Sequence, residues 1–326
     1  MGINSEIYKP SKKHWAWHPQ PDNPEAWQWW YNEGIFDNGY TTAIVCNATE
    51  TVSAITLDIC DPYGNRITEM PMFSPDQIVY STETLDVKWG ENFLRGKYPR
   101  YELHMLFGDN GADLVFEAIT QEWMEPRDGV YIGRETFPPT IPYCAYINHC
   151  RCKVSGKLIV AGKEIPVKGH GYHDHQWGNI LFWNLLQYWY WGKLDFPNHT
   201  IMWWETMLQS KYGYQKFKWL WGFKGDKLIE YKNDAKIYVE NLDFKEDPKY
   251  GVSLPQKVIV TIDDERIKGT ATHSIKSILY FVQLPEELQA GAWTKYIRYV
   301  SDCQGKFEVD GEKIELNSVQ IHESGV

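Results

Sequence analysis

The chain has 326 residues, of which 33 are Lys or Arg and 43 are Asp or Glu, so its formal net charge is −10 at pH 7. This balance argues against a nucleic-acid partner, because such binders present concentrated basic surface and no Lys/Arg run here exceeds two residues. The start of the chain has no apolar run typical of a secretory signal, and the six cysteines contain no CxxC pair. We therefore expect a cytoplasmic protein with free thiols.

Short β-type runs, separated by polar and glycine-containing turns, follow one another along the chain. They occupy residues 25–47, 54–70, 100–120, 156–175, 199–209, 214–231, 257–275 and 296–324. Only residues 285–296 suggest a short helix. The pattern is typical of antiparallel meanders, sandwiches and barrels. It predicts an all-β fold with two β domains of ordinary size, 1–185 and 186–326.

Aromatic residues are unusually frequent. The chain contains 16 Trp, 21 Tyr and 13 Phe, and the tryptophans cluster in HWAWH, WQWWY, FWNLLQYWYWG, MWWE and WLWGF. Any single ring, such as Trp30 or Trp203, is most simply part of a hydrophobic core. A set of this size is hard to pack at normal density, whereas pockets for apolar ligands are commonly lined by rings. We therefore expect a small hydrophobic substrate in an aromatic-lined pocket.

The stretch ILFWNLLQYWYWG, residues 180–192, is too short to span a bilayer and is interrupted by Asn184 and Gln187. Its simplest interpretation is a buried linker or core segment between the domains. The alternative is an apolar lid or a patch in peripheral contact with a membrane, through which an apolar substrate enters. No feature of the sequence specifies an oligomeric state.

The segment GHGYHDHQWG, residues 169–178, concentrates three histidines, a tyrosine, an aspartate and a tryptophan in ten positions. An extended strand alternates its side chains between two faces. One face would carry His170, Tyr172, Asp174 and Gln176, and the other His173, His175 and Trp177. Glycines at 169, 171 and 178 would let another backbone or a ligand approach closely.

Three kinds of site fit this segment. The spacing His173-x-His175 is one by which a strand offers two imidazoles to zinc, but nothing singles out His104 or His149 as a third ligand, so we expect no metal. In a purely structural interpretation, Asp174 and the histidines only satisfy backbone groups. In an acid–base site, a carboxyl beside a phenol and walled by rings has its charged form desolvated, which raises its pKa and lets it donate a proton near neutral pH.

The motif resembles the signature of the hydroxyneurosporene synthase (carotenoid hydratase) and AttH-like family of two-domain lipocalin-like proteins. WQWWY followed by GIFDNGY is similar to that family's N-terminal strand, and VSGKLIVAGKEIPVKG and YWYWGKLDFPNHTIMWW flank the motif in the matching order. The resemblance runs from about residue 25 to the end of the chain. It implies two lipocalin-like antiparallel β-barrel or sandwich domains in tandem.

The resemblance also implies a site and a reaction. Residues expected to act in catalysis are Asp174, Tyr172 and His175, and those expected to contact substrate are His173, Trp177, Trp203, Glu205 and Trp30. Without any cofactor, Asp174 would protonate a C=C bond of an isoprenoid or polyene. Rings such as Tyr172, Trp177 and Trp203 would stabilise the carbocation by cation–π attraction. A water held by Tyr172 or His175 would then attack it, which makes the protein a hydratase, a class of lyase.

Two alternative functions stay open. Lipocalin-like relatives of this family catalyse intramolecular Diels–Alder cyclisation of polyenes in natural-product pathways. That reaction requires a folded substrate and one hydrogen-bonded carbonyl, for which Tyr172, His175 or Glu205 could serve. The other alternative is a carrier that binds an apolar ligand without changing it.

Overall fold

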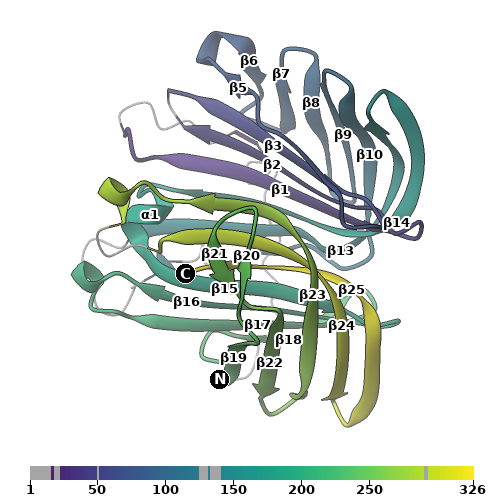
Figure 1. Cartoon of the computed structure of the whole chain (residues 1–326), viewed down its shortest axis with the longest axis vertical. Helices are drawn as coiled ribbons and strands as arrows, with labels where there is room; N and C mark the ends of the chain where they lie inside the picture. The colour runs from purple at the N-terminus through teal and green to yellow at the C-terminus, as the bar shows by residue number, and fades with distance from the viewer. Residues whose placement is uncertain (1–15, 18–22, 50, 125–130, 133–140, 290–292) are drawn as a thin grey trace. The chain divides into compact units, whose positions relative to one another are not determined.

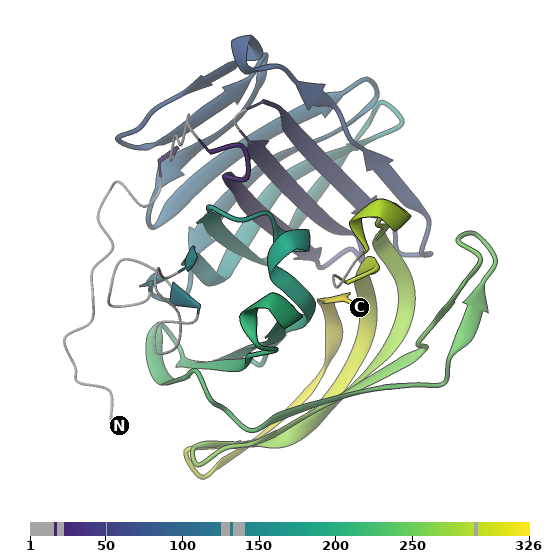
Figure 2. The same ribbon diagram turned by 90° about the vertical axis from the view of Figure 1, so that its left-hand side faces the viewer.

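The computed structural model describes residues 16–17, 23–49, 51–124, 131–132, 141–289 and 293–326. The chain divides into two compact units, unit 1 (Met1–Phe182) and unit 2 (Trp183–Val326). Each unit is built on a curled antiparallel sheet (Figures 1 and 2). The prediction of an all-β antiparallel fold is confirmed. The predicted domain bounds, 1–185 and 186–326, stay a prediction.

Unit 1 contains one large sheet. In spatial order its strands are β4 (Arg66–Glu69), β3 (Ser53–Cys60), β2 (Thr41–Thr49), β1 (Trp27–Phe36), β14 (Lys163–Gly178), β13 (Ile141–Val160), β10 (Asn110–Ala118), β9 (Arg100–Phe107), β8 (Asn92–Lys97), β7 (Leu85–Trp89) and β6 (Ile78–Tyr80). Three short strands pair beside this path: β5 (Met72–Phe73) with β3, and β11 (Trp123–Met124) and β12 (Tyr131–Ile132) with β13.

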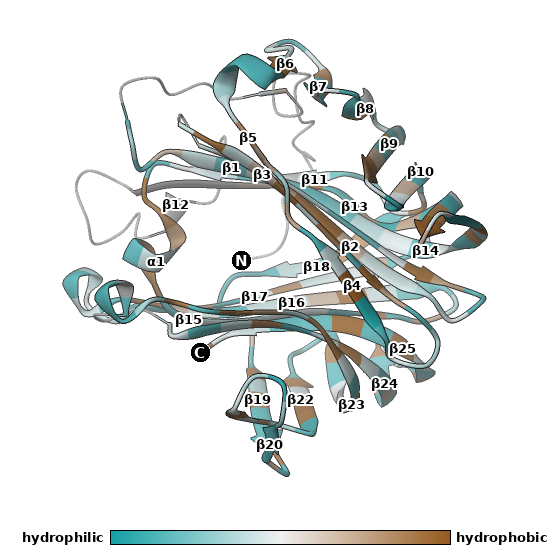
Figure 3. Cartoon of the chain, turned by 45° about the horizontal axis from the view of Figure 1, so that its top comes forward, coloured by the Kyte–Doolittle hydropathy of each residue, from teal (hydrophilic) through white to brown (hydrophobic). Residues whose placement is uncertain are grey.

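Alternating side chains give unit 1 its core. In β7, Leu85, Val87 and Trp89 are buried whereas the residues between them are exposed, as expected for a strand with one face in the core. Figure 3 shows hydrophobic residues gathered along β2, while the short edge strand β4 is mainly hydrophilic. Strand β14 is central in the sheet, and from Gly171 to Gly178 nearly every residue on both of its faces is buried. This is the part of β14 that contains most of the motif.

Unit 2 repeats the architecture with fewer strands. Its sheet runs β18 (Lys227–Lys232), β17 (Lys216–Lys224), β16 (His199–Leu208), β15 (Leu186–Asp195), β25 (Glu312–Gly325), β24 (Lys295–Val309), β23 (Ile267–Gln283), β22 (Lys257–Asp263) and β19 (Ile237–Leu242). Strands β20 (Lys245–Asp247) and β21 (Val252–Leu254) form a separate pair. Its core includes Trp203, Leu220, Val260 and Phe307.

Helical structure is sparse in the described residues. It consists of α1 (Phe182–Leu185) and the 3₁₀ turns η2 (Pro75–Gln77), η3 (Ser210–Tyr212) and η4 (Glu286–Leu288). The helix expected over 285–296 is reduced to η4, because the chain pairs with β23 from Lys295 onward; residues 290–292 lie outside the described ones. The apolar stretch 180–192 forms α1 and the first part of β15. No helix in the described part of the chain is long and apolar enough to cross a membrane.

Candidate active site

Strand β14, which carries GHGYHDHQWG, lies between β1 and β13 in the middle of unit 1 (Figure 1). A Cβ atom on Gly169 would lie 2.1 Å from the carbonyl oxygen of Ile35, and one on Gly171 would lie 2.1 Å from that of Glu33. Separations this short do not occur between carbon and oxygen that are not bonded, so the pairing of β1 with β14 requires glycine at both positions. The predicted close approach of another backbone is confirmed for these two glycines.

Tyr172, Asp174 and Gln176 lie on one face of β14, which we call the Asp174 face. The Tyr172 hydroxyl donates a hydrogen bond to Oδ2 of Asp174 at 2.7 Å, and Nε2 of Gln176 donates to the same oxygen at 2.5 Å. Asp174 is only 3% exposed. Two donors on one carboxyl oxygen fix its orientation, so a proton carried by this group would be on Oδ1.

Strand β1 adds a second carboxyl group to the Asp174 face. The register places Tyr31 opposite Asp174 and Glu33 opposite Tyr172. The Tyr31 hydroxyl donates to Oε2 of Glu33 at 3.1 Å, and the rings of Tyr31 and Tyr172 meet edge to face with centroids 5.9 Å apart. Glu33 is fully buried. The face therefore combines two buried carboxyl groups with two phenols.

Tyr31, Glu33 and Gln176 are not among the site residues that the sequence predicts. Tyr31 and Glu33 could have been paired from the sequence, because their spacing of two in WQWWYNEGIF puts both on one face of β1. The sequence does not contain the register that places this face beside Asp174. The alternation along the strand predicts that Gln176 shares a face with Asp174, but an amide side chain alone does not indicate a site residue.

Tyr172 is a hydrogen-bond donor rather than a phenolate. Burial raises its pKa well above the ordinary value of 10, and the nearby carboxyl groups of Asp174 and Glu33 raise that pKa further. The phenol therefore stays protonated near neutral pH and can hold either the Asp174 carboxyl or an oxygen of a bound ligand.

His173, His175 and Trp177 lie on the opposite face of β14, toward the core of unit 1. The His175 ring stacks on Trp30 with centroids 4.5 Å apart, and the Trp177 ring lies 4.8 Å from it. Trp30 and Trp177 both belong to the core cluster. The structure thus brings Trp30, His175 and Trp177 together, but on the other side of the strand from the Asp174 carboxyl.

Two buried histidines of unit 1, His173 and His149, are neutral near pH 7 because their pKa values are lowered. Nδ1 of His173 lies 3.0 Å from the carbonyl oxygen of Tyr31, and burial lowers the pKa of His173 to about 4. The His149 ring is 6.0 Å away, and burial and then His173 lower the pKa of His149 well below its usual value. His104 hydrogen-bonds to Asp113 instead. Within the described ranges, no three His, Cys, Asp or Glu side chains form a group that could hold a metal ion.

Two predicted contact residues, Trp203 and Glu205, lie on β16 in unit 2. The Trp203 indole packs over Gly192, where a Cβ atom would come within 2.9 Å of the ring. The Glu205 carboxylate forms ion pairs with Lys216 at 2.6 Å and Lys218 at 3.1 Å. Trp203 is therefore seated in the core of unit 2, whereas Glu205 has charged partners.

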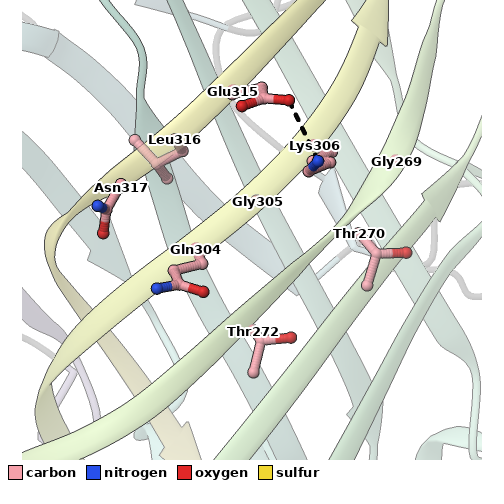
Figure 4. A pocket seen from close by; sticks show the side chains of 9 residues that line it. All are labelled: Gly269, Thr270, Thr272, Gln304, Gly305, Lys306, Glu315, Leu316 and Asn317. Carbon is pink, nitrogen blue, oxygen red and sulfur yellow. Dashed lines mark ion pairs between the residues drawn. The ribbon is translucent and has the colours of Figure 1, made fainter.

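A shallow hollow of about 600 Å³ lies over β23, β24 and β25 on unit 2 (Figure 4). An ion pair between Lys306 and Glu315 at 3.2 Å crosses it. The described residues that line it are mostly threonines, glycines, glutamine and asparagine, and none of them is aromatic. The hollow is therefore not the expected aromatic-lined pocket, which stays a prediction.

The curled antiparallel sheets define a lipocalin-like fold, as solved structures show. An AttH protein from Nitrosomonas europaea has a TM-score of 0.67 and 13% sequence identity, over 92% of each chain. No protein-family model matches the chain, and no curated protein matches its sequence.

Two further solved structures share the fold. The protein CghA, solved with Sch210972, has a TM-score of 0.69 and 9% identity over 98% of this chain and 95% of its own. Kievitone hydratase from Nectria haematococca has a TM-score of 0.62 and 15% identity over 94% of this chain and 90% of its own. The lipocalin-like fold predicted from the resemblance is confirmed. The specific relation to carotenoid hydratases stays a prediction.

Proposed function

We propose that this protein is an acid–base enzyme that adds water to a C=C bond of a small apolar molecule, or removes it. The observation that supports this most strongly is the Asp174 face, where a buried carboxyl is fixed through Oδ2 by a phenol and an amide. A carboxyl held in one orientation and shielded from water is suited to general acid catalysis. A lipocalin-like hydratase among the structures of this fold is consistent with that chemistry.

The proposed reaction uses two carboxyl groups in turn. Asp174 gives the proton on Oδ1 to one alkene carbon, which leaves a carbocation at the other. A water molecule adds to the cation and loses a proton to Glu33, so that the product is a neutral alcohol. A pair of carboxyl groups in different surroundings is the arrangement that lets one act as acid and the other as base.

The position of the aromatic rings indicates which of them could stabilise the carbocation. Tyr31 and Tyr172 lie on the Asp174 face and can stabilise a carbocation by cation–π attraction, by about 0.5–2 kcal/mol each. Trp177 and His175 lie on the core side of β14. Trp177 was expected to stabilise the cation and His175 to hold the attacking water. We therefore revise the proposed role of both residues to support of the strand.

A cyclase is the second candidate, and the Tyr172 phenol favours it. A buried donor with a raised pKa can hydrogen-bond one carbonyl of a folded polyene without transferring a proton. The proposed substrate is in either case a small apolar molecule. The proposed setting is the cytoplasm, where the free cysteines of the described residues would stay reduced.

Product analysis in labelled water separates these functions. Purified protein is incubated in H₂¹⁸O with a linear isoprenoid and with a linear polyene, and the products are examined by mass spectrometry. We expect a product that has gained one labelled water. A product that is an isomer of unchanged mass would contradict the hydratase and favour the cyclase. A ligand that is bound but unchanged would identify the protein as a carrier.

A further inference from the structure

The closing strands of the two units carry the same sequence pattern. Residues 154–174, VSGKLIVAGKEIPVKGHGYHD, align without a gap with residues 303–323, CQGKFEVDGEKIELNSVQIHE. Six positions are identical, and they follow the pattern G-K-x-x-V-x-G-x-x-I followed, after seven residues, by H. The residue after the shared histidine is Asp174 in unit 1 and Glu323 in unit 2.

The same hairpin sets the position of both segments. The two-residue turns Ala161–Gly162 and Asp310–Gly311 have φ values of 49°, 75°, 50° and 79°. Two successive left-handed residues define the tight turn that matches the twist of paired strands. In each unit the strand that follows this turn therefore reaches the histidine and the acid after the same number of residues. The pairing with the preceding strand runs without a shift to Glu323 in unit 2, whereas β-bulges shift it before His173 in unit 1.

Both histidines face the core of their unit. His322 lies 4.4 Å from the His273 ring and stacks at 5.0 Å on Tyr299, while His173 contacts Tyr101 and His149 in unit 1. Because side chains alternate along a strand, the acid that follows each histidine points away from the core. Unit 2 thus has a carboxyl group, Glu323, at the strand position that Asp174 occupies in unit 1.

We propose that Glu323 belongs to a second ligand site, in unit 2, where Arg298 and Tyr296 bind an organic anion through a carboxylate or enolate oxygen. Arg298 is 1% exposed and lies opposite Glu323 in the pairing of β24 with β25. Its Nη2 donates to the Tyr296 hydroxyl at 2.5 Å, and its Nε lies 3.7 Å from Oε1 of Glu323. A guanidinium in such a place is the standard means by which proteins recognise a planar anionic oxygen group.

The surroundings of Glu323 consist mainly of donors. The side chains of Tyr296 and Arg298 from β24 and of Trp189 from β15 favour the charged form of its carboxyl, which opposes the rise in its pKa. From β23 the Tyr280 ring lies 5.5 Å from the Arg298 guanidinium carbon, as does the Tyr296 ring. This site differs from the Asp174 face, where both donors to the carboxyl are neutral. Because Arg298 is a cation, we expect the site in unit 2 to prefer an anionic ligand. The Asp174 face has no such preference.

Binding of an anion at this site should be accompanied by proton uptake. Burial raises the pKa of Glu323, and Arg298 opposes that rise. An anion that takes over Arg298 weakens this opposition and adds a like charge beside the carboxyl, so Glu323 becomes protonated. The buried site then holds one cation and one anion, as it did before the ligand bound.

The test compares all-trans-retinoic acid with its methyl ester, which have the same apolar chain but differ in charge. Binding is followed by tryptophan fluorescence, and proton uptake by calorimetry in two buffers of different ionisation enthalpy. We expect the acid to bind the wild-type protein about tenfold more tightly than the ester, as one charge-assisted hydrogen bond would provide. We also expect uptake of close to one proton per acid bound, and none with the ester.

Variants assign these effects to residues. Glu323→Gln should bind the acid at least as tightly but without proton uptake. The paired change Arg298→Gln with Glu323→Gln, which leaves no buried charge unpaired, should bind acid and ester alike. Glu315→Gln, at an exposed carboxylate on the same strand, is the matched control and should behave as wild type.

Several results would overturn this site. They are equal binding of acid and ester, no saturable binding of either probe, or wild-type proton uptake in Glu323→Gln. A Glu323→Gln protein that is only less stable, with unchanged binding and proton uptake, would make the pair a structural ion pair. Asp174→Asn should keep the preference for the acid, so failure here is distinguishable from failure of the proposed hydration.

Discussion

Tyr172 and Asp174 have different proposed roles. The Tyr172 hydroxyl orients the Asp174 carboxyl, and Asp174 transfers the proton. Replacing Tyr172 by Phe keeps the ring against Tyr31 but removes the donor to Oδ2 of Asp174. We expect turnover to fall about 10- to 100-fold, the size of one hydrogen bond to a carboxyl group that becomes charged as it gives up its proton. Steady-state kinetics measures this, with the exposed Tyr63→Phe as control. Unchanged turnover in Tyr172→Phe would remove the phenol from the site.

The residues of the Asp174 face differ in how well the sequence alone predicts them. Tyr172 and Asp174 could be placed on one face, because alternation along a strand is a local property. Glu33 is 141 positions from Asp174 in the chain (174 − 33) and enters the site only through the pairing of β1 with β14. Such a pairing depends on the whole sheet, and therefore no short segment specifies it.

At the scale of the element, the glycines of β14 set how closely it packs. A Cβ atom on Gly171 would overlap the Glu33 carbonyl, a backbone atom that cannot move without disrupting the pairing of β1 with β14. We expect Gly171→Ala to lower the free energy of unfolding by about 1–3 kcal/mol, as overpacking does. Urea denaturation measures this. Gly305→Ala, whose nearest neighbour would be a side-chain atom at 3.3 Å, should cost less, and equal costs would contradict this account.

Buried neutral histidines make the stability of these elements depend on pH. Burial lowers the pKa of His273 from 6.5 to about 4. As the pH falls from about 6.5 to 4, the unfolded chain takes up this proton and the folded chain does not, so stability is lost in that window. One such group contributes about 3 kcal/mol over the whole window.

Urea denaturation at several pH values tests this linkage. His273→Gln should show a shallower loss of stability than the wild type between pH 6.5 and 4. Gln304→Ala, at an exposed residue of β24, removes no titratable group and should keep the wild-type slope. A His273→Gln slope equal to that of the wild type would show that this residue does not carry the effect.

The elements themselves were largely predictable, with one instructive error. The β-type runs and turns were visible because alternation and turn residues are local signals. Residues 285–296 have helix-forming composition, yet the described part of this range contains the short turn η4 and the start of β24. The strand prevails there because Tyr296 pairs with Val282 of β23 and with Gly325 of β25, which lie outside the segment itself.

At the scale of the whole molecule, the 16 tryptophans are still expected to report on a bound ligand. Trp30, Trp177 and Trp203 pack into the cores of their units, which fits the structural interpretation of each single ring. If other rings line a pocket, an apolar polyene should quench the intrinsic fluorescence with saturable, micromolar-range binding. A linear response without saturation would argue against any pocket.

The central claim is that Asp174 transfers a proton, and the variant Asp174→Asn tests it most directly. An amide oxygen in place of Oδ2 can still accept from Tyr172 and Gln176, while the transferable proton is lost. Asp58→Asn is the matched control, because Asp58 is also fully buried but lies on β3, with β2 and β1 between it and β14.

Turnover and melting temperature are measured on both variants with the substrate that product analysis identifies. We predict that Asp174→Asn loses about 10²- to 10⁴-fold in turnover, as expected for a general acid. Its melting temperature should stay close to that of the wild type, and Asp58→Asn should retain its turnover. A stable Asp174→Asn protein with full activity would show that Asp174 does not transfer a proton, and it would contradict the proposed hydratase function.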